Sequence, residues 1–186
     1  RQQDHADHGA HGKVLLADHL LVDVGRQHIE VAADHLGDAE IGDNQREDDQ
    51  RGAWDELQKL ALTARDTVVG IAAGGTTPYV LGAMEFCKTS LPEGARPITG
   101  MISCVNIDAP AHVDHFIILK TGPEVLTGST RMKAGTATKM TLNTISTTLM
   151  VRSGRVYQNL MVDVRATNDK LRDRAARIIA AITGLP

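Results

Sequence analysis

The stretch DTVVGIAAGGTTP, residues 66–78, decides the fold of this chain. Its first part, residues 66–73, is short, apolar and rich in β-branched side chains, which is typical of a buried parallel strand. Two glycines and two threonines follow, and then Pro78, which suits the first turn of a helix because its missing N–H would be unpaired there. The sequence therefore predicts a strand, a tight glycine turn and a helix in direct succession.

The rest of the chain from residue 54 onward continues this alternation. Apolar residues at helical spacing indicate the further helices, and short apolar runs indicate the further strands. Asn168 is a candidate N-cap for the last helix, and Gly184 is a candidate stop. Strands that alternate with helices predict an α/β fold with a parallel sheet and flanking helices. The predicted elements are a helix over 54–64, strands over 98–105 and 115–119, and helices over 129–152 and 168–182.

The composition of the 186 residues excludes several classes of protein. The formal net charge is −3 and aromatic residues make up 3%, so we expect no nucleic-acid partner. Two cysteines, Cys87 and Cys104, are too few for a disulfide scaffold and fit a reducing compartment. No apolar stretch has the length of a membrane span, and the polar N-terminus does not resemble a signal peptide.

Residues 1–53 differ in composition from the remainder. They hold six of the eight histidines and 12 acidic against 5 basic residues, a net charge of −7, whereas residues 54–186 carry +4. A break of this kind marks a domain boundary, which we place near Trp54. We therefore predict two regions: an unmatched His/Asp-rich segment over 1–53 and a partial α/β domain over 54–186.

Three interpretations of residues 1–53 stay open. The first is a disordered or weakly helical arm, because the short apolar groups around Val14 and Leu21 keep no clean period. The second is a metal site, since His5, His8 and His11 recur every three residues; no completing ligand set is evident, so we expect no metal. The third is an artefact of gene calling, because Asp, His and Gln codons read on the opposite strand become codons for apolar residues.

The segment Gly74, Gly75, Thr76 and Thr77 is the first that carries chemistry. A glycine pair after a strand lets the backbone approach a ligand, and the N–H groups at the start of the next helix favour an anion. The spacing matches neither a P-loop nor the dinucleotide fingerprint. A tight strand-to-helix turn that needs glycine is the alternative, and the sequence does not decide between the two.

The second segment is EVLTGSTRMKAGTATKM, residues 124–140. Hydroxyl side chains surround Gly128 at the start of a predicted helix, and basic residues follow where they oppose the helix dipole, which indicates a nearby anion. A capping sequence followed by a solvated basic face is the alternative. The helix itself is rich in threonine, a mediocre helix former, so we expect it to be packed, either in the core or at a subunit interface.

Three runs together closely resemble the N-acetylmuramic acid 6-phosphate etherase family: GIAAGGTTPYV (70–80), GPEVLTGSTRMKAGTATKM (122–140) and VYQNLMVDVRATNDKLRDRA (156–175). The resemblance covers the chain from about Trp54 to its end. It implies a flavodoxin-like sheet of the SIS (sugar isomerase) group, a cytoplasmic homodimer, and a lyase without a cofactor. The implied substrate is a phosphorylated amino sugar, whose ether to D-lactate is cleaved by elimination in cell-wall recycling.

The resemblance also implies which residues bind substrate. Gly74, Gly75, Thr76 and Thr77 match the family's sugar-phosphate loop, although many relatives have Ser-Gly-Arg-Thr there. A second ligand-facing block matches the residues Ser129, Thr130 and Lys133, with Glu124 just before it. We expect all eight residues to bind substrate and none of them to be catalytic.

The family's catalytic glutamates and its first phosphate loop match no part of this chain. Because the chain also starts at Arg1 rather than Met, we expect a fragment that is inactive alone, with apolar faces left uncovered. A non-catalytic phosphosugar-binding module, similar to the regulatory protein of glucokinase, is the alternative. A phosphosugar isomerase of the same group is a third possibility.

Overall fold

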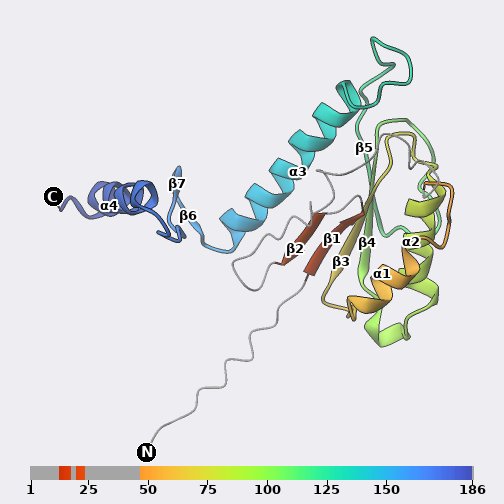
Figure 1. Cartoon of the computed structure of the whole chain (residues 1–186), viewed down its shortest axis with the longest axis horizontal. Helices are drawn as coiled ribbons and strands as arrows, with labels where there is room; N and C mark the ends of the chain where they lie inside the picture. The colour runs from red at the N-terminus through yellow and green to blue at the C-terminus, as the bar shows by residue number, and fades with distance from the viewer. Residues whose placement is uncertain (1–12, 18–19, 24–46, 186) are drawn as a thin grey trace, which may run out of the picture. The chain divides into compact units, whose positions relative to one another are not determined.

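The computed structural model describes residues 13–17, 20–23 and 47–185 (Figure 1). It divides into two compact units, Arg1–Thr138 and Lys139–Pro186. The first unit contains the sheet and nearly all of the candidate binding segments, and the second contains the larger part of one long helix, a hairpin and the last helix. Each unit is considered by itself below.

The first unit is built on a five-stranded sheet in the order β2-β1-β3-β4-β5. β1, β3, β4 and β5 run parallel, and β2 is antiparallel to β1 at one edge. The predicted α/β fold with a parallel sheet and flanking helices is confirmed. The strands are β1 (Lys13–Ala17), β2 (Leu20–Asp23), β3 (Thr67–Ile71), β4 (Ile98–Ser103) and β5 (His115–Ile118).

Two of these strands lie in the segment where the sequence predicted none. β1 and β2 form from the two short apolar groups of residues 1–53. β1 pairs with β3 in the register Val14↔Thr67 to Ala17↔Gly70, so its partner lies some fifty residues away in the chain. Local periodicity does not reveal such a pairing. The rest of that segment, including His5, His8 and His11, lies outside the described residues.

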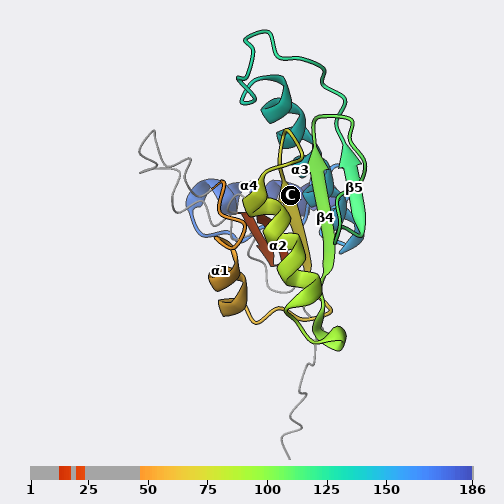
Figure 2. The same ribbon diagram turned by 90° about the vertical axis from the view of Figure 1, so that its right-hand side faces the viewer.

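Helices α1 (Trp54–Lys59) and α2 (Pro78–Thr89) cover one face of the sheet, with α2 lying across β3 and β4 in Figure 2. Pro78 occupies the first turn of α2, as predicted. Val68 of β3 packs with Met84 and Cys87 of α2 in a fully buried cluster. Burial of such side chains is the main stabilising contribution to the unit.

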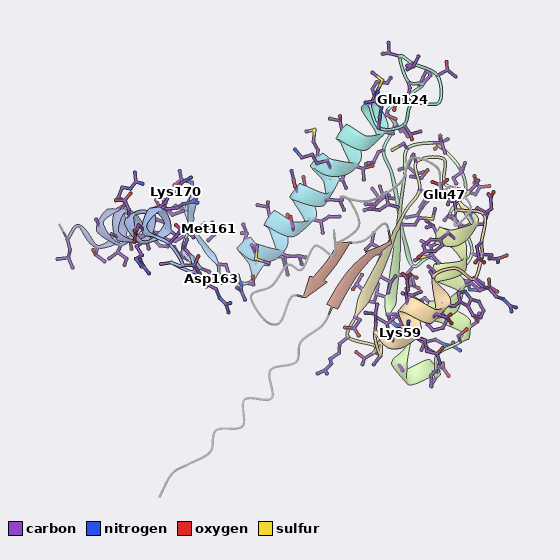
Figure 3. The ribbon with its side chains drawn as sticks, in the orientation of Figure 1. Glu47, Lys59, Glu124, Met161, Asp163 and Lys170 are labelled. Carbon is purple, nitrogen blue, oxygen red and sulfur yellow. The ribbon has the colours of Figure 1, made fainter. Side chains whose placement is uncertain are left out.

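The packing continues before Trp54. The N–H of Tyr79 donates to the carbonyl of Glu47 over 3.0 Å, and the Gln50 side chain donates to Glu85 over 2.9 Å. The label of Glu47 lies beside α2 in Figure 3. Residues 47–53 therefore form a strap against α2, and the folded unit includes part of the segment that the sequence separated near Trp54.

A charged hydrogen-bond network lies where β4 and β5 begin. Lys88 Nζ donates to Asp114 Oδ2 over 2.5 Å and to the carbonyl of Pro97 over 2.9 Å. The N–H and hydroxyl of the buried Thr99 donate to the same carboxylate oxygen. Burial raises the pKa of Asp114, but the hydrogen bonds from Lys88 and Thr99 together hold it below its usual 3.8.

We expect Asp114→Asn to destabilise the chain at pH 7 by about 1 kcal/mol, a figure reduced for solvent screening of a partly exposed pair. Because the folded-state pKa is depressed, this stabilisation is present above the ordinary pKa and is lost as the pH falls through the folded value. Urea unfolding at pH 7 and at acid pH measures the difference, with Asp108→Asn as a control on an exposed loop. An equal effect of Asp114→Asn at both pH values would contradict this assignment.

The remaining elements lie toward the C-terminus. α3 (Lys133–Arg152) begins later than predicted, because residues 130–132 form a turn. Ala134, in the first turn of α3, is buried in the described structure. A hairpin of β6 (Val156–Tyr157) and β7 (Leu160–Met161) follows.

α4 (Asp169–Thr183) has the predicted caps at both ends. Asn168 Oδ1 accepts from the N–H of Leu171 over 2.9 Å, and Gly184 takes the left-handed conformation, with φ of 70°. Of the helices in the described ranges, none combines the length and the apolar character that crossing a membrane requires.

Candidate functional site

The candidate site lies at the carboxyl edge of the parallel strands. The glycine segment follows β3, Ser103 and Cys104 end and follow β4, and the loop after β5 leads to α3. In open parallel sheets, ligands bind in the crevices at this edge, where loops and helix N-termini meet. The topology therefore brings both segments that the sequence singled out to the same end of the sheet.

The glycine segment is a tight turn with different demands at its two glycines. Gly75 has φ of 76°, and a Cβ there would lie 2.4 Å from Ile107 Cδ1 and 3.0 Å from Ser103 Oγ. Its N–H donates to the carbonyl of Ala72 over 2.9 Å. Gly75 is therefore required by the turn itself, because a side chain would be strained in that conformation and crowded.

Neither the backbone conformation nor the described neighbours of Gly74 require a glycine at that position. A Cβ at Gly74 would meet nothing closer than Thr76 Oγ1 at 4.0 Å, and its φ is not positive. Open space in front of this backbone is what a closely approaching ligand needs. Thr77 is the N-cap of α2, and its side chain makes no capping hydrogen bond. The turn therefore explains the glycine at position 75, whereas the described residues give no reason for a glycine at position 74.

Ser103 is a further residue of the candidate site, which the sequence patterns did not indicate. It ends β4, is fully buried, and its hydroxyl lies beside Gly75. Its Oγ accepts from the N–H of Val105 over 3.2 Å and lies 3.4 Å from the carbonyl of Ala73. A second polar residue in a strand that also holds Thr99 was the available signal, because buried hydroxyls need partners.

Contacts of Cys104 connect this strand end to α3. Cys104 Sγ lies 3.8 Å from the carbonyl of Ala134 and 3.9 Å from Thr138 Oγ1. A thiol is a weak donor, so these contacts act mainly as packing. Ser103 lies beside Gly75 and Cys104 lies beside Ala134, so these two neighbouring residues connect the two candidate segments.

The second segment is a loop held against the first turn of α3. Glu124 Oε2 accepts from the N–H of Lys133 over 2.9 Å, and Oε1 accepts from the N–H of Ala134 over 2.8 Å. Figure 3 shows Glu124 at this end of α3. The hydrogen bonds from Ala134 and Lys133 hold the pKa of the Glu124 carboxyl below its usual value. This carboxylate is therefore ionised at neutral pH.

The other predicted residues lie on the same loop. Ser129 and Thr130 are in its turns: the N–H of Ser129 donates to Leu126 and that of Thr130 to Gly128. Val125 and Leu126 are 85% and 62% exposed. Lys133 Nζ lies near Gly122, at 3.8 Å from the position of a Cβ there. The loop thus gathers two hydroxyls and one ammonium group, which are donors for an anion.

The described residues offer little for metal or thiol chemistry. No group of three or more His, Cys, Asp and Glu side chains within those ranges is arranged to hold a metal ion. Both cysteines are buried free thiols. Burial raises the pKa of the Cys87 thiol to about 12, so Cys87 stays protonated and is no nucleophile.

Fold and loops together define an α/β protein with two donor-rich loops at the carboxyl edge of a parallel sheet. No family model matches the chain. It is 56% identical over 141 residues to an N-acetylmuramic acid 6-phosphate etherase of Exiguobacterium sp. and 53% identical over 140 residues to that of Mycolicibacterium smegmatis. The etherase 1 of Bacillus licheniformis is 52% identical over 132 residues.

These matches cover 70–75% of this chain and 42–46% of each relative. The chain thus spans about half the length of the curated relatives it matches. The predicted resemblance to the N-acetylmuramic acid 6-phosphate etherase family is confirmed over three quarters of the sequence.

Proposed function

We propose that this chain forms the phosphosugar-binding part of an N-acetylmuramic acid 6-phosphate etherase. The reaction splits the ether between D-lactate and the sugar and gives N-acetylglucosamine 6-phosphate. The observation that carries the proposal is the glycine turn, in which Gly74 leaves open space before the N-terminus of α2. Identity above 50% to proteins named as such etherases supports the substrate class.

Seven of the eight predicted residues have a defined part in this proposal. Gly74 and Gly75 let the phosphate approach backbone N–H groups, and the hydroxyls of Thr76 and Thr77 add donors. From the second loop, Ser129 and Thr130 supply hydroxyls and Lys133 supplies a positive charge. Several charge-assisted bonds of this kind select a phosphorylated sugar over the free sugar. A cytoplasmic homodimer is part of the same proposal.

The elimination also requires a base at carbon 2 of the sugar and an acid at the departing lactate oxygen. None of the eight assigned residues is given either role. Glu124 is the one carboxylate among the eight, and both of its oxygens accept backbone hydrogen bonds. This observation favours the second candidate function, a phosphosugar-binding module that performs no chemistry alone.

Calorimetric titration of the full chain with N-acetylmuramic acid 6-phosphate tests the proposal. We expect saturable binding that is weakened at least tenfold, about 1.4 kcal/mol, when the phosphate is omitted from the sugar. Equal affinity for the two sugars, or no binding of either, would contradict a phosphate site. A D-lactate assay on the same samples distinguishes the two candidate functions. We expect no release of D-lactate, and its release would establish catalysis by the chain itself.

A further inference from the structure

We propose that Glu124 is a positioning residue, which holds the donor-rich loop in its binding conformation without contacting substrate. This inference rests on the proposed function, and it differs from the substrate contact that the sequence predicts for Glu124. It starts from one geometric fact. Both carboxylate oxygens of Glu124 are used by consecutive backbone N–H groups nine and ten residues further along the chain.

These two bonds close the loop over 124–134. The first N–H groups of a helix have no partner inside the helix, so a carboxylate that accepts from two of them stabilises the helix start. The capping residue usually lies directly before its helix, whereas Glu124 reaches across the whole intervening loop. Its two bonds therefore fix both ends of the segment that carries Ser129 and Thr130.

The interior of the loop has few other constraints. Its internal hydrogen bonds are backbone turns between neighbouring residues, such as Met132 N–H to the carbonyl of Ser129 over 3.2 Å, and one bond from α3, Gly135 N–H to the carbonyl of Thr130 over 2.8 Å, holds its end. Val125 and Leu126 are largely exposed and give it little apolar anchoring. Among the described contacts, the Glu124 carboxylate is thus the principal tie between the start of this loop and α3. Without it, the loop would have to be ordered when the ligand binds, which lowers affinity.

The position of the Lys133 ammonium group depends on the same tie. Glu124 holds the backbone N–H of Lys133 at 2.9 Å, while the Lys133 side chain extends past Gly122. A ligand that uses Lys133 therefore benefits from a fixed backbone beneath it.

Three variants of the full chain test this assignment. Glu124→Ala removes both acceptors, Glu124→Gln keeps the length and one acceptor oxygen, and Glu93→Gln is the matched control in the short turn Glu93–Ala95. We expect the Kd for N-acetylmuramic acid 6-phosphate to rise about tenfold for Glu124→Ala and less for Glu124→Gln, with no change for the control.

Amide hydrogen exchange supplies a second readout on the same proteins. In Glu124→Ala, the amides of Lys133 and Ala134 should exchange faster, while those of β3 and β4 keep their protection and so report an intact fold. Unchanged affinity, or unchanged exchange of those two amides, would overturn the positioning role and leave the proposed function standing. Absence of binding by the unsubstituted chain would overturn the proposed function and this role with it.

Discussion

Replacing Gly82 with alanine is expected to lower the free energy of unfolding by about 2 kcal/mol, although alanine is the better helix former. Gly82 lies inside α2, where the helix propensity of alanine alone would gain about 1 kcal/mol. A Cβ at this position, however, would lie 1.6 Å from the carbonyl oxygen of Gln50 and 2.7 Å from its carbon. Both atoms are backbone, so no rotation of a side chain relieves the clash.

The strap of residues 47–53 must then move away from α2. That movement breaks the bond between Tyr79 N–H and Glu47 and disturbs Trp54, whose indole N–H donates to the carbonyl of Gly82 over 3.1 Å. Trp54 also stacks at a tilt on Phe86, with ring centroids 5.6 Å apart. Overpacking of this kind costs more than the helix propensity returns.

Urea unfolding followed by circular dichroism measures this effect, and Gly94→Ala is the control. A Cβ at Gly94 would meet nothing within 4 Å, so we expect that variant to match the unsubstituted chain to within about 0.5 kcal/mol. Limited trypsin cleavage after Arg51 should also become faster in Gly82→Ala. Equal stability of the two variants would mean that residues 47–53 do not pack on α2.

The sequence predicted the elements whose signals are local. The strand before Gly74, the helix that begins at Pro78 and the caps of α4 each depend on residues within a few positions of one another, and all three are confirmed. The two donor-rich segments were also found from the sequence. The parallel order of the strands then explains why both lie at one edge of the sheet.

Features that depend on distant partners were missed. β1 is ordered by pairing with β3, and no pattern within five residues announces that partner. Ser103 becomes a site residue only because β4 lies beside β3 and brings its hydroxyl next to Gly75. The role of Glu124 depends on a loop closure of nine residues, whereas the usual capping signals span three. Tertiary geometry decided each of these three cases.

Paired substitutions in the glycine turn should separate its structural role from its ligand role. Gly75→Ala forces alanine into a left-handed conformation, which costs about 1 kcal/mol, and crowds Ser103, so we expect lower stability and at least tenfold weaker binding of N-acetylmuramic acid 6-phosphate. Displacement of Ile107 adds little to this loss of stability, since the new methyl group would touch only the far end of a flexible side chain.

Gly74→Ala is the informative partner, because among the described residues its new Cβ would meet nothing closer than Thr76 Oγ1 at 4.0 Å. We expect its stability to stay within about 0.5 kcal/mol of the unsubstituted protein, while its affinity for the phosphosugar falls, since the methyl group occupies the space that the ligand would enter. Urea unfolding and calorimetric titration of the two variants measure both quantities. If Gly74→Ala binds the phosphosugar as tightly as the unsubstituted chain, the segment is a turn that needs glycine only at Gly75. Loss of binding with full stability would show that Gly74 is kept small for the ligand, because no contact among the described residues requires glycine there.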